Sequence, residues 1–134
     1  MNNLNWAVVD DDAIFHLTTK MLIEREAISK KILLFYNGKE LIDHLKEHAQ
    51  TPENLPDVIL LDLNMPVMDG WDFLNVYLPI KHTLSKETII YIVSSSVDNK
   101  DILKAKEISE VKNYIVKPLE KYKLEGILEE LSNL

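Results

Sequence analysis

The sequence predicts an α/β fold: a doubly wound, five-stranded parallel sheet with helices on both faces. Short apolar runs alternate five times with longer segments of helical period, which is the pattern of successive βα units. The segments at 57–62 and 88–94 are continuously apolar between their polar ends, as expected for parallel strands that helices cover on both faces. Right-handed crossovers between such units then give a doubly wound sandwich. A length of 134 residues suits a single domain spanning 1–134.

The first half of the chain supplies two βα units. The apolar run "WAVVD" at 6–10 predicts a strand, and Asp12 is a suitable N-cap for a helix over 13–27. "KILLFY" at 31–36 predicts a strand that Asn37-Gly38 closes, and "KELIDHLKEHA" at 39–49 predicts an amphipathic helix that ends before the prolines of 52–56. The helix over 13–27 has one side formed by Ile14, Leu17, Thr18, Met21 and Leu22.

The second half supplies three more units. "DVILLD" at 57–62 predicts a strand, followed by a helix over 70–78 that Asp69 caps and that begins its exit at Pro79. "TIIYIVS" at 88–94 and "NYIVK" at 113–117 predict the last two strands, with a helix over 99–108 between them. The final helix, over 121–131, carries one apolar stripe of Leu124, Ile127, Leu128 and Leu131.

Composition argues against several classes of function. Fifteen basic and 22 acidic residues give a net charge of -7, which disfavours nucleic acid and anionic membranes as partners, because both reward clustered Lys and Arg. The absence of cysteine excludes disulfides and thiolate chemistry. The amino terminus does not have the basic region of a signal peptide, and no apolar stretch reaches the roughly 20 residues of a membrane helix. A cytoplasmic protein without an output domain is expected.

Polar residues stand at the carboxyl ends of the predicted strands. All carboxyl ends of an open parallel sheet face one edge, where ligands bind. We therefore expect one shallow pocket with three or four carboxylates, a small hydroxyl and an ammonium group. The residues that stand at those strand ends are Asp10, Asp11, Asp12, Asp62, Ser94, Ser95, Ser96 and Lys117. Among them, Asp12 is assigned mainly to capping the next helix and Ser96 to the loop.

Such a pocket predicts a bound divalent cation. Two like charges 4 Å apart repel by roughly 4 kcal/mol at an effective dielectric near 20, so clustered carboxylates bind protons or a cation. Oxygen ligands favour a hard ion, and Mg2+ (or Mn2+) fits best. The charges of Asp10, Asp11 and Asp62 would balance those of Mg2+ and Lys117. Beside these cations the Asp62 carboxylate could attack phosphorus and form an acyl phosphate, with the Ser94 hydroxyl donating to the phosphoryl oxygens.

Four motifs resemble response-regulator receiver domains of two-component signalling. "VVDDD", "LLDLNMPVMDGWDF", "IVSSS" and "NYIVKP" occur in that family's order and spacing, over the whole chain. The resemblance implies a flavodoxin-like strand order of 2-1-3-4-5. It also implies that Asp62 is the phospho-acceptor and that Asp11, Asp62 and the backbone carbonyl of Asn64 bind Mg2+ directly, with Asp10 acting through water.

The resemblance further implies a conformational switch. Ser94 stands at the position of the switch hydroxyl, Tyr114 at that of the switch aromatic residue, and Lys117 at that of the phosphate-binding lysine. The Lys117–Pro118 peptide bond is expected to be cis. Phosphorylation would draw Ser94 toward the pocket and let Tyr114 turn inward, and a downstream protein would read the changed face formed by 99–108, 113–117 and 121–131.

The implied function is phosphorelay signal transduction. A sensor histidine kinase or a histidine phosphotransfer protein would phosphorylate Asp62, and the chain would promote its own phosphorylation and dephosphorylation without being an enzyme for another substrate. One alternative is a Mg2+-dependent phosphohydrolase with an aspartyl-phosphate intermediate. Those enzymes usually carry a second Asp two residues after the nucleophile, where this chain has Asn64. The other alternative is a degenerate receiver that acts as a constitutive binding module, against which the complete set of acids, Ser94 and Lys117 argues.

Overall fold

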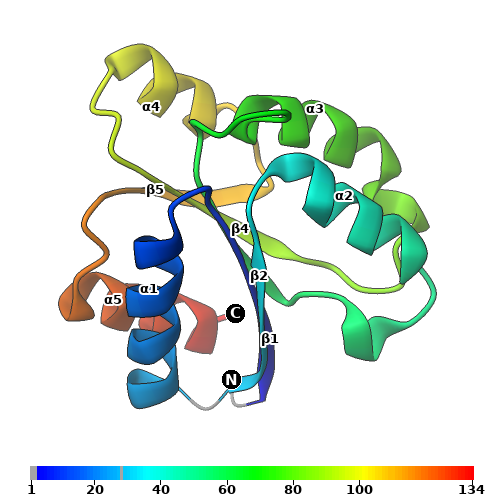
Figure 1. The fold of residues 1–134 in the computed structure, drawn as a ribbon, viewed down its shortest axis with the longest axis horizontal. Coiled ribbons are helices and arrows are strands. Elements are labelled where there is room, and N and C mark those ends of the chain that lie inside the picture. The colour runs from blue at the N-terminus through cyan, green and yellow to red at the C-terminus, as the bar shows by residue number, and fades with distance from the viewer. Residues whose placement is uncertain (1–2, 28) are drawn as a thin grey trace.

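The computed structural model describes residues 3–27 and 29–134, and these form one sheet with helices on both faces (Figure 1). All strand pairs are parallel, in the order β2-β1-β3-β4-β5. The predicted doubly wound α/β fold and its strand order are therefore confirmed. The strands are β1 (Leu4–Val9), β2 (Ser29–Phe35), β3 (Val58–Leu61), β4 (Ile89–Ser94) and β5 (Val111–Val116). The helices are α1 (Ala13–Glu26), α2 (Gly38–Glu47), α3 (Gly70–Ile80), α4 (Asn99–Lys106) and α5 (Lys121–Ser132).

The helices form two layers around the central strands. Figure 1 shows α1 and α5 on one face of the sheet and α2, α3 and α4 on the other. Successive residues of β1 alternate between the two cores: Ala7 and Val9 pack with α2 and α3, while Trp6 and Val8 pack with α1 and α5. This alternation is the period of two of an extended strand. Because both faces are covered, β3 is buried along its whole length, as its apolar run predicted.

Side-chain caps start α1, α2, α3 and α4 at the carboxyl edge of the sheet. Asp12 Oδ1 accepts the backbone N–H of Ile14 at 2.9 Å, which confirms the predicted N-cap of α1. Asp69 caps α3 in a reciprocal capping box with Asp72. These caps fix where each helix leaves the edge of the sheet.

Some predicted boundaries shift by a few residues. The strand predicted over 31–36 begins at Ser29, and the one predicted over 113–117 begins at Val111. Asn37-Gly38 does more than close a strand, because Asn37 caps α2 and Gly38 is its first residue. Pro79 does not end α3, which continues to Ile80 and into a 3-10 turn, η2 (Lys81–Thr83). The loop predicted around 52–56 contains a 3-10 turn, η1 (Pro52–Asn54).

The apolar side predicted for the first helix is mostly on the surface. Ile14, Leu17 and Met21 are 72%, 60% and 52% exposed. The residues of α1 that are buried against the sheet and α5 are His16, Thr19 and Ile23. The helix is turned this way because His16 is held beneath it by a hydrogen bond from Nε2 to the Asp10 carbonyl, at 2.6 Å. The helix therefore presents an apolar strip to solvent.

No helix in the described part of the chain is both long enough and apolar enough to span a bilayer.

Candidate functional site

Three carboxylates gather where β1 and β3 end. Asp10 and Asp11 follow β1 and Asp62 follows β3, and one carboxylate oxygen from each lies within 4.8 Å of the others. Asp10 and Asp62 are 1% and 6% exposed, whereas Asp11 is exposed. The pocket thus combines two buried carboxylates with one that solvent reaches.

Backbone hydrogen bonds between neighbouring strands hold the two buried acids in place. The Asp62 N–H donates to the Val9 carbonyl at 2.9 Å, and the Asp10 N–H donates to the Phe35 carbonyl at 3.0 Å. These bonds continue the parallel ladders one residue beyond the strands, so each acid leaves the sheet at a fixed position. The Asp10 carboxylate is fixed further, because its Oδ1 accepts the backbone N–H of Asp12 at 2.9 Å.

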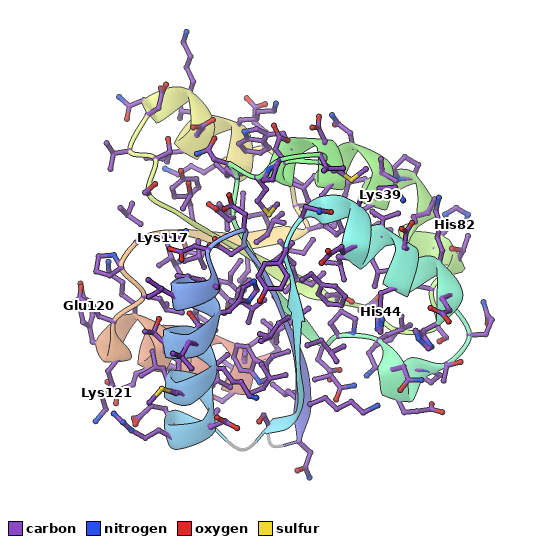
Figure 2. The ribbon with its side chains drawn as sticks, viewed as in Figure 1. Lys39, His44, His82, Lys117, Glu120 and Lys121 are labelled. Atoms are coloured by element: carbon purple, nitrogen blue, oxygen red, sulfur yellow. The ribbon has the colours of Figure 1, made fainter. Side chains whose placement is uncertain are left out.

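Lys117 brings the positive charge of the pocket from the end of β5. Its Nζ lies 2.6 Å from Asp10 Oδ2 and 3.6 Å from Asp62 Oδ2, and 4.5 Å from the centre of the Phe15 ring. Figure 2 labels Lys117 beside the start of α1. The Lys117 N–H donates to the Ser94 carbonyl at 2.9 Å, and the Lys117–Pro118 bond is cis, as expected. Burial lowers the pKa of Lys117, but the hydrogen bond and charge of Asp10 outweigh it, so that pKa is raised above 10.5.

Ionisation of the Asp62 carboxyl is unfavourable in the folded protein. Burial raises the pKa of its carboxyl from 3.8 to about 6, and the negative charge of Asp10 adds to the rise. Lys117 and the backbone N–H groups of Leu63 and Asn64 offset only part of it. Further positive charge would therefore stabilise the ionised pocket. The donors are all carboxylate oxygens, the ligands that Mg2+ prefers, so Asp10, Asp11 and Asp62 fit a hard divalent ion.

The loop after Asp62 is tightly built. A Cβ at Gly70 would collide with the carbonyl oxygen of Asp62, so only glycine lets the start of α3 approach this closely. Within the loop, the Met68 N–H donates to the Pro66 carbonyl at 2.7 Å across Val67, whose φ is 66°. A β-branched residue seldom adopts a positive φ, so the backbone is strained at this turn. Asn64 lies in the same loop with its side chain exposed.

The two expected switch residues are connected through Ser96. Ser94 is fully buried, and its Oγ accepts the Ser96 N–H at 3.1 Å. Tyr114 is half-buried against the core on the α3 and α4 side, and its hydroxyl donates to the Ser96 carbonyl at 2.8 Å. Ser96 itself drew no functional expectation from the sequence. No pattern in the sequence indicates that Ser96 lies between Ser94 and Tyr114 in space, because Ser96 and Tyr114 are 18 residues apart along the chain.

His16 is the other residue of this site that sequence reasoning missed. Its side chain is 2% exposed, and its ring lies 4.6 Å from that of Tyr36. By donating to the Asp10 carbonyl it fixes the backbone of an acid in the pocket. A histidine in a helix of mixed polarity gives no sign that it will be buried.

Known proteins resemble this chain in sequence. A family model described as the response regulator receiver domain matches residues 7–129. The chain is 27% identical over 124 residues to the probable methanogenesis regulatory protein FilR2 of Methanothrix harundinacea, covering 92% of this chain and 78% of that protein. It is 29% identical over 120 residues to protein-glutamate methylesterase/protein-glutamine glutaminase 2 of Carboxydothermus hydrogenoformans, covering 88% of this chain but only 30% of that protein.

Solved structures show the same similarity. A two-component response regulator from Cytophaga hutchinsonii superposes with a TM-score of 0.87 and 25% identity, covering 99% of this chain and 100% of that one. A response regulator receiver protein from Dyadobacter fermentans superposes with a TM-score of 0.77 and 28% identity, covering 94% and 95% of the two chains. With the family matched over residues 7–129 and five parallel strands in the same arrangement, this chain belongs to the response regulator receiver domain family of two-component signalling.

Proposed function

We propose that this chain is a phospho-accepting response regulator and that Asp62 is its acceptor. The observation that carries the proposal is the geometry around Asp62, a buried carboxylate with the Lys117 ammonium 3.6 Å away and two further acids beside it. With a pKa of about 6, the Asp62 carboxyl is ionised at neutral pH and able to act as a nucleophile.

The proposed reaction is phosphoryl transfer from a phosphohistidine. An oxygen of Asp62 attacks the phosphorus as the phosphorus–nitrogen bond breaks, giving an acyl phosphate, and the departing imidazole takes up a proton. When bound by Asp10, Asp11 and Asp62, with the Asn64 carbonyl as a further ligand, Mg2+ (or Mn2+) would supply positive charge for the phosphoryl oxygens. Lys117 offers those oxygens an ammonium group, and Ser94 is proposed to donate its hydroxyl to them.

The donor is proposed to be a protein, a sensor histidine kinase or a histidine phosphotransfer protein. The apolar strip of α1 supports a protein donor, because Ile14, Leu17 and Met21 are exposed on the helix that starts directly after Asp10 and Asp11. A histidine that reaches Asp62 brings its own protein against this surface. Burying such side chains would stabilise the complex by roughly 1.5–3 kcal/mol for each one fully covered.

The output is proposed to be a change in the surface formed by α4, β5 and α5. Tyr114 lies on β5 and contacts the loop between β4 and α4 through Ser96, so a shift of Ser94 would reach this surface directly. A downstream protein would distinguish the two states by their shape.

A Mg2+-dependent phosphohydrolase is less well supported. Asn64 stands where those enzymes carry a second Asp, and it cannot act as a general acid. The activity of the methylesterase is not proposed either, because this chain covers only 30% of that protein. The proposal therefore limits catalysis to the chain's own phosphorylation and dephosphorylation.

The test is to incubate the protein with acetyl phosphate and Mg2+ and to measure its intact mass. We expect the addition of one phosphoryl group to the wild type, and none to Asp62→Asn or to the wild type in EDTA. Addition to Asp62→Asn would place the acceptor elsewhere and refute the proposal. Rapid turnover of several unrelated phosphate esters would favour the hydrolase instead.

A further inference from the structure

Asp101 of α4 joins three separate elements through its carboxylate. Oδ1 accepts the indole N–H of Trp71 on α3 at 3.2 Å, and Oδ2 accepts the hydroxyl of Ser96 at 2.7 Å, in the loop between β4 and α4. Lys104, also on α4, places its Nζ 4.5 Å from the centre of the Trp71 ring. We call the set of Trp71, Ser96 and Asp101 the Asp101 bridge.

The Asp101 bridge is connected to the switch residues by hydrogen bonds at Ser96. The Ser96 N–H donates to Ser94 Oγ at 3.1 Å, and the Ser96 carbonyl accepts the Tyr114 hydroxyl at 2.8 Å. A continuous chain of hydrogen bonds thus runs from Ser94, through Ser96 and Asp101, to Trp71. Ser96 follows Ser94 by two residues, so a displacement of Ser94 also moves the Ser96 hydroxyl, which donates to Asp101.

The helix that the bridge holds is mostly exposed. Of the eight residues of α4, all in the described part of the chain, Ala105 alone is buried, and Leu103 is 59% exposed. Full burial of apolar side chains in α4 is thus limited to Ala105, and the two hydrogen bonds to the Asp101 carboxylate add to the anchoring of the helix. Hydrogen bonds to a charged group are stronger than those between neutral groups, which suits such an anchor.

We propose that Asp101 is a positioning residue that couples phosphorylation of Asp62 to α4, by a bridge that opens on phosphorylation. This inference rests on the proposed function and names the residue through which phosphorylation of Asp62 affects α4. When the Ser94 hydroxyl turns to donate to the phosphoryl group, Ser96 moves with it and its bond to Asp101 breaks. Asp101 then no longer links the loop to Trp71, and α4 is free to change its position on α3.

The two tryptophans of the chain make the bridge measurable. Their indole N–H groups give two signals in a proton–nitrogen correlation spectrum. Trp6 is fully buried at the opposite face of the sheet and serves as an internal reference, while Trp71 reports on the bridge. A Trp71→Phe variant assigns the signals.

The experiment records this spectrum for the full chain, with and without excess acetyl phosphate and Mg2+, alongside the intact mass. We expect phosphorylation to move the Trp71 signal and leave that of Trp6 in place. Ser96→Ala removes the hydroxyl that donates to Asp101 and that also accepts the Asp98 N–H at 3.3 Å, but keeps the backbone bonds to Ser94 and Tyr114. In this variant the Trp71 signal should already lie near its phosphorylated position and should move less than half as far on phosphorylation.

Ser85→Ala is the control, because it removes an exposed hydroxyl before the amino end of β4, at the edge of the sheet opposite the pocket, and should behave as the wild type. An unchanged Trp6 signal in each variant shows that the fold is intact. If the mass shows phosphorylation but the Trp71 signal stays still, or moves as far in Ser96→Ala as in the wild type, the coupling is refuted while the proposed function stands. If no phosphoryl group is added, the proposed function fails and the coupling with it.

Discussion

Replacing Asp62 by Asn should stabilise the folded protein at neutral pH, although it removes the proposed acceptor. Asn has nearly the same shape but no charge. The pKa of Asp62 is about 6 in the folded protein against an ordinary value of 3.8, so folding disfavours its ionised form. For a carboxyl with a raised pKa, stability is fully present below the unfolded pKa and is lost as pH rises through the folded one. At neutral pH the ionised Asp62 therefore lowers the stability of the folded wild type, and Asp62→Asn removes this cost.

The size of the effect follows from the two pKa values. Each pKa unit corresponds to about 1.36 kcal/mol, so the gap between 3.8 and about 6 predicts a gain of about 3 kcal/mol at pH 7.5. By the same linkage, the gain falls to about 2 kcal/mol at pH 5 and to less than about 1 kcal/mol at pH 4. The exposed fraction of Asp62 is only 6%, so solvent screens this penalty little.

Urea unfolding, followed by circular dichroism in EDTA at the three pH values, measures the difference directly. The exposed Glu24→Gln variant changes the net charge of -7 by the same one unit and should show no such gain. Adding Mg2+ should then stabilise the wild type more than Asp62→Asn, because bound ligand stabilises the form that binds it. Parallel stability profiles for the wild type and Asp62→Asn between pH 4 and 7.5 would refute the reasoning.

Two further substitutions test the loop and the surface beside the pocket. Val67→Gly should raise stability by roughly 0.5–1 kcal/mol, since it relieves a positive φ at an exposed side chain, whereas Val97→Gly, also exposed, should lower it in the same urea assay. Leu17→Glu should leave phosphorylation by acetyl phosphate unchanged but slow transfer from a phosphorylated histidine phosphotransfer protein by about tenfold, measured by rapid-quench phosphorylation. Equal transfer rates for Leu17→Glu and the wild type would show that α1 does not contact the phosphoryl donor protein.

The exposed apolar side of α1 shows where pattern reading stops. Ile14, Leu17 and Met21 recur at helical spacing, and that spacing alone favours them as the buried side. The fold instead buries His16, because a carbonyl at the end of β1 offers its ring nitrogen a hydrogen bond. Burial is decided by what the neighbouring elements present to a helix, and no window of local sequence contains that information.

The Asp101 bridge was out of reach of the sequence for a similar reason. Trp71 and Asp101 are 30 residues apart, and Ser96 and Asp101 belong to a loop and a short helix whose relative placement no local pattern specifies. Their hydrogen bonds exist only once α3 and α4 lie side by side. The raised pKa of Asp62 likewise depends on how completely the fold excludes water from it.

The sequence by itself determined the five βα units and the edge of the sheet at which Asp10, Asp11, Asp62 and Lys117 stand. Apolar period and length distinguish strands from helices, and the carboxyl ends of parallel strands all face one way. Only the tertiary structure decided the distances among those four residues, the side of α1 that is buried and the connection from Ser94 to α4. These depend on contacts between segments far apart along the chain, and such contacts form only when the whole domain is folded.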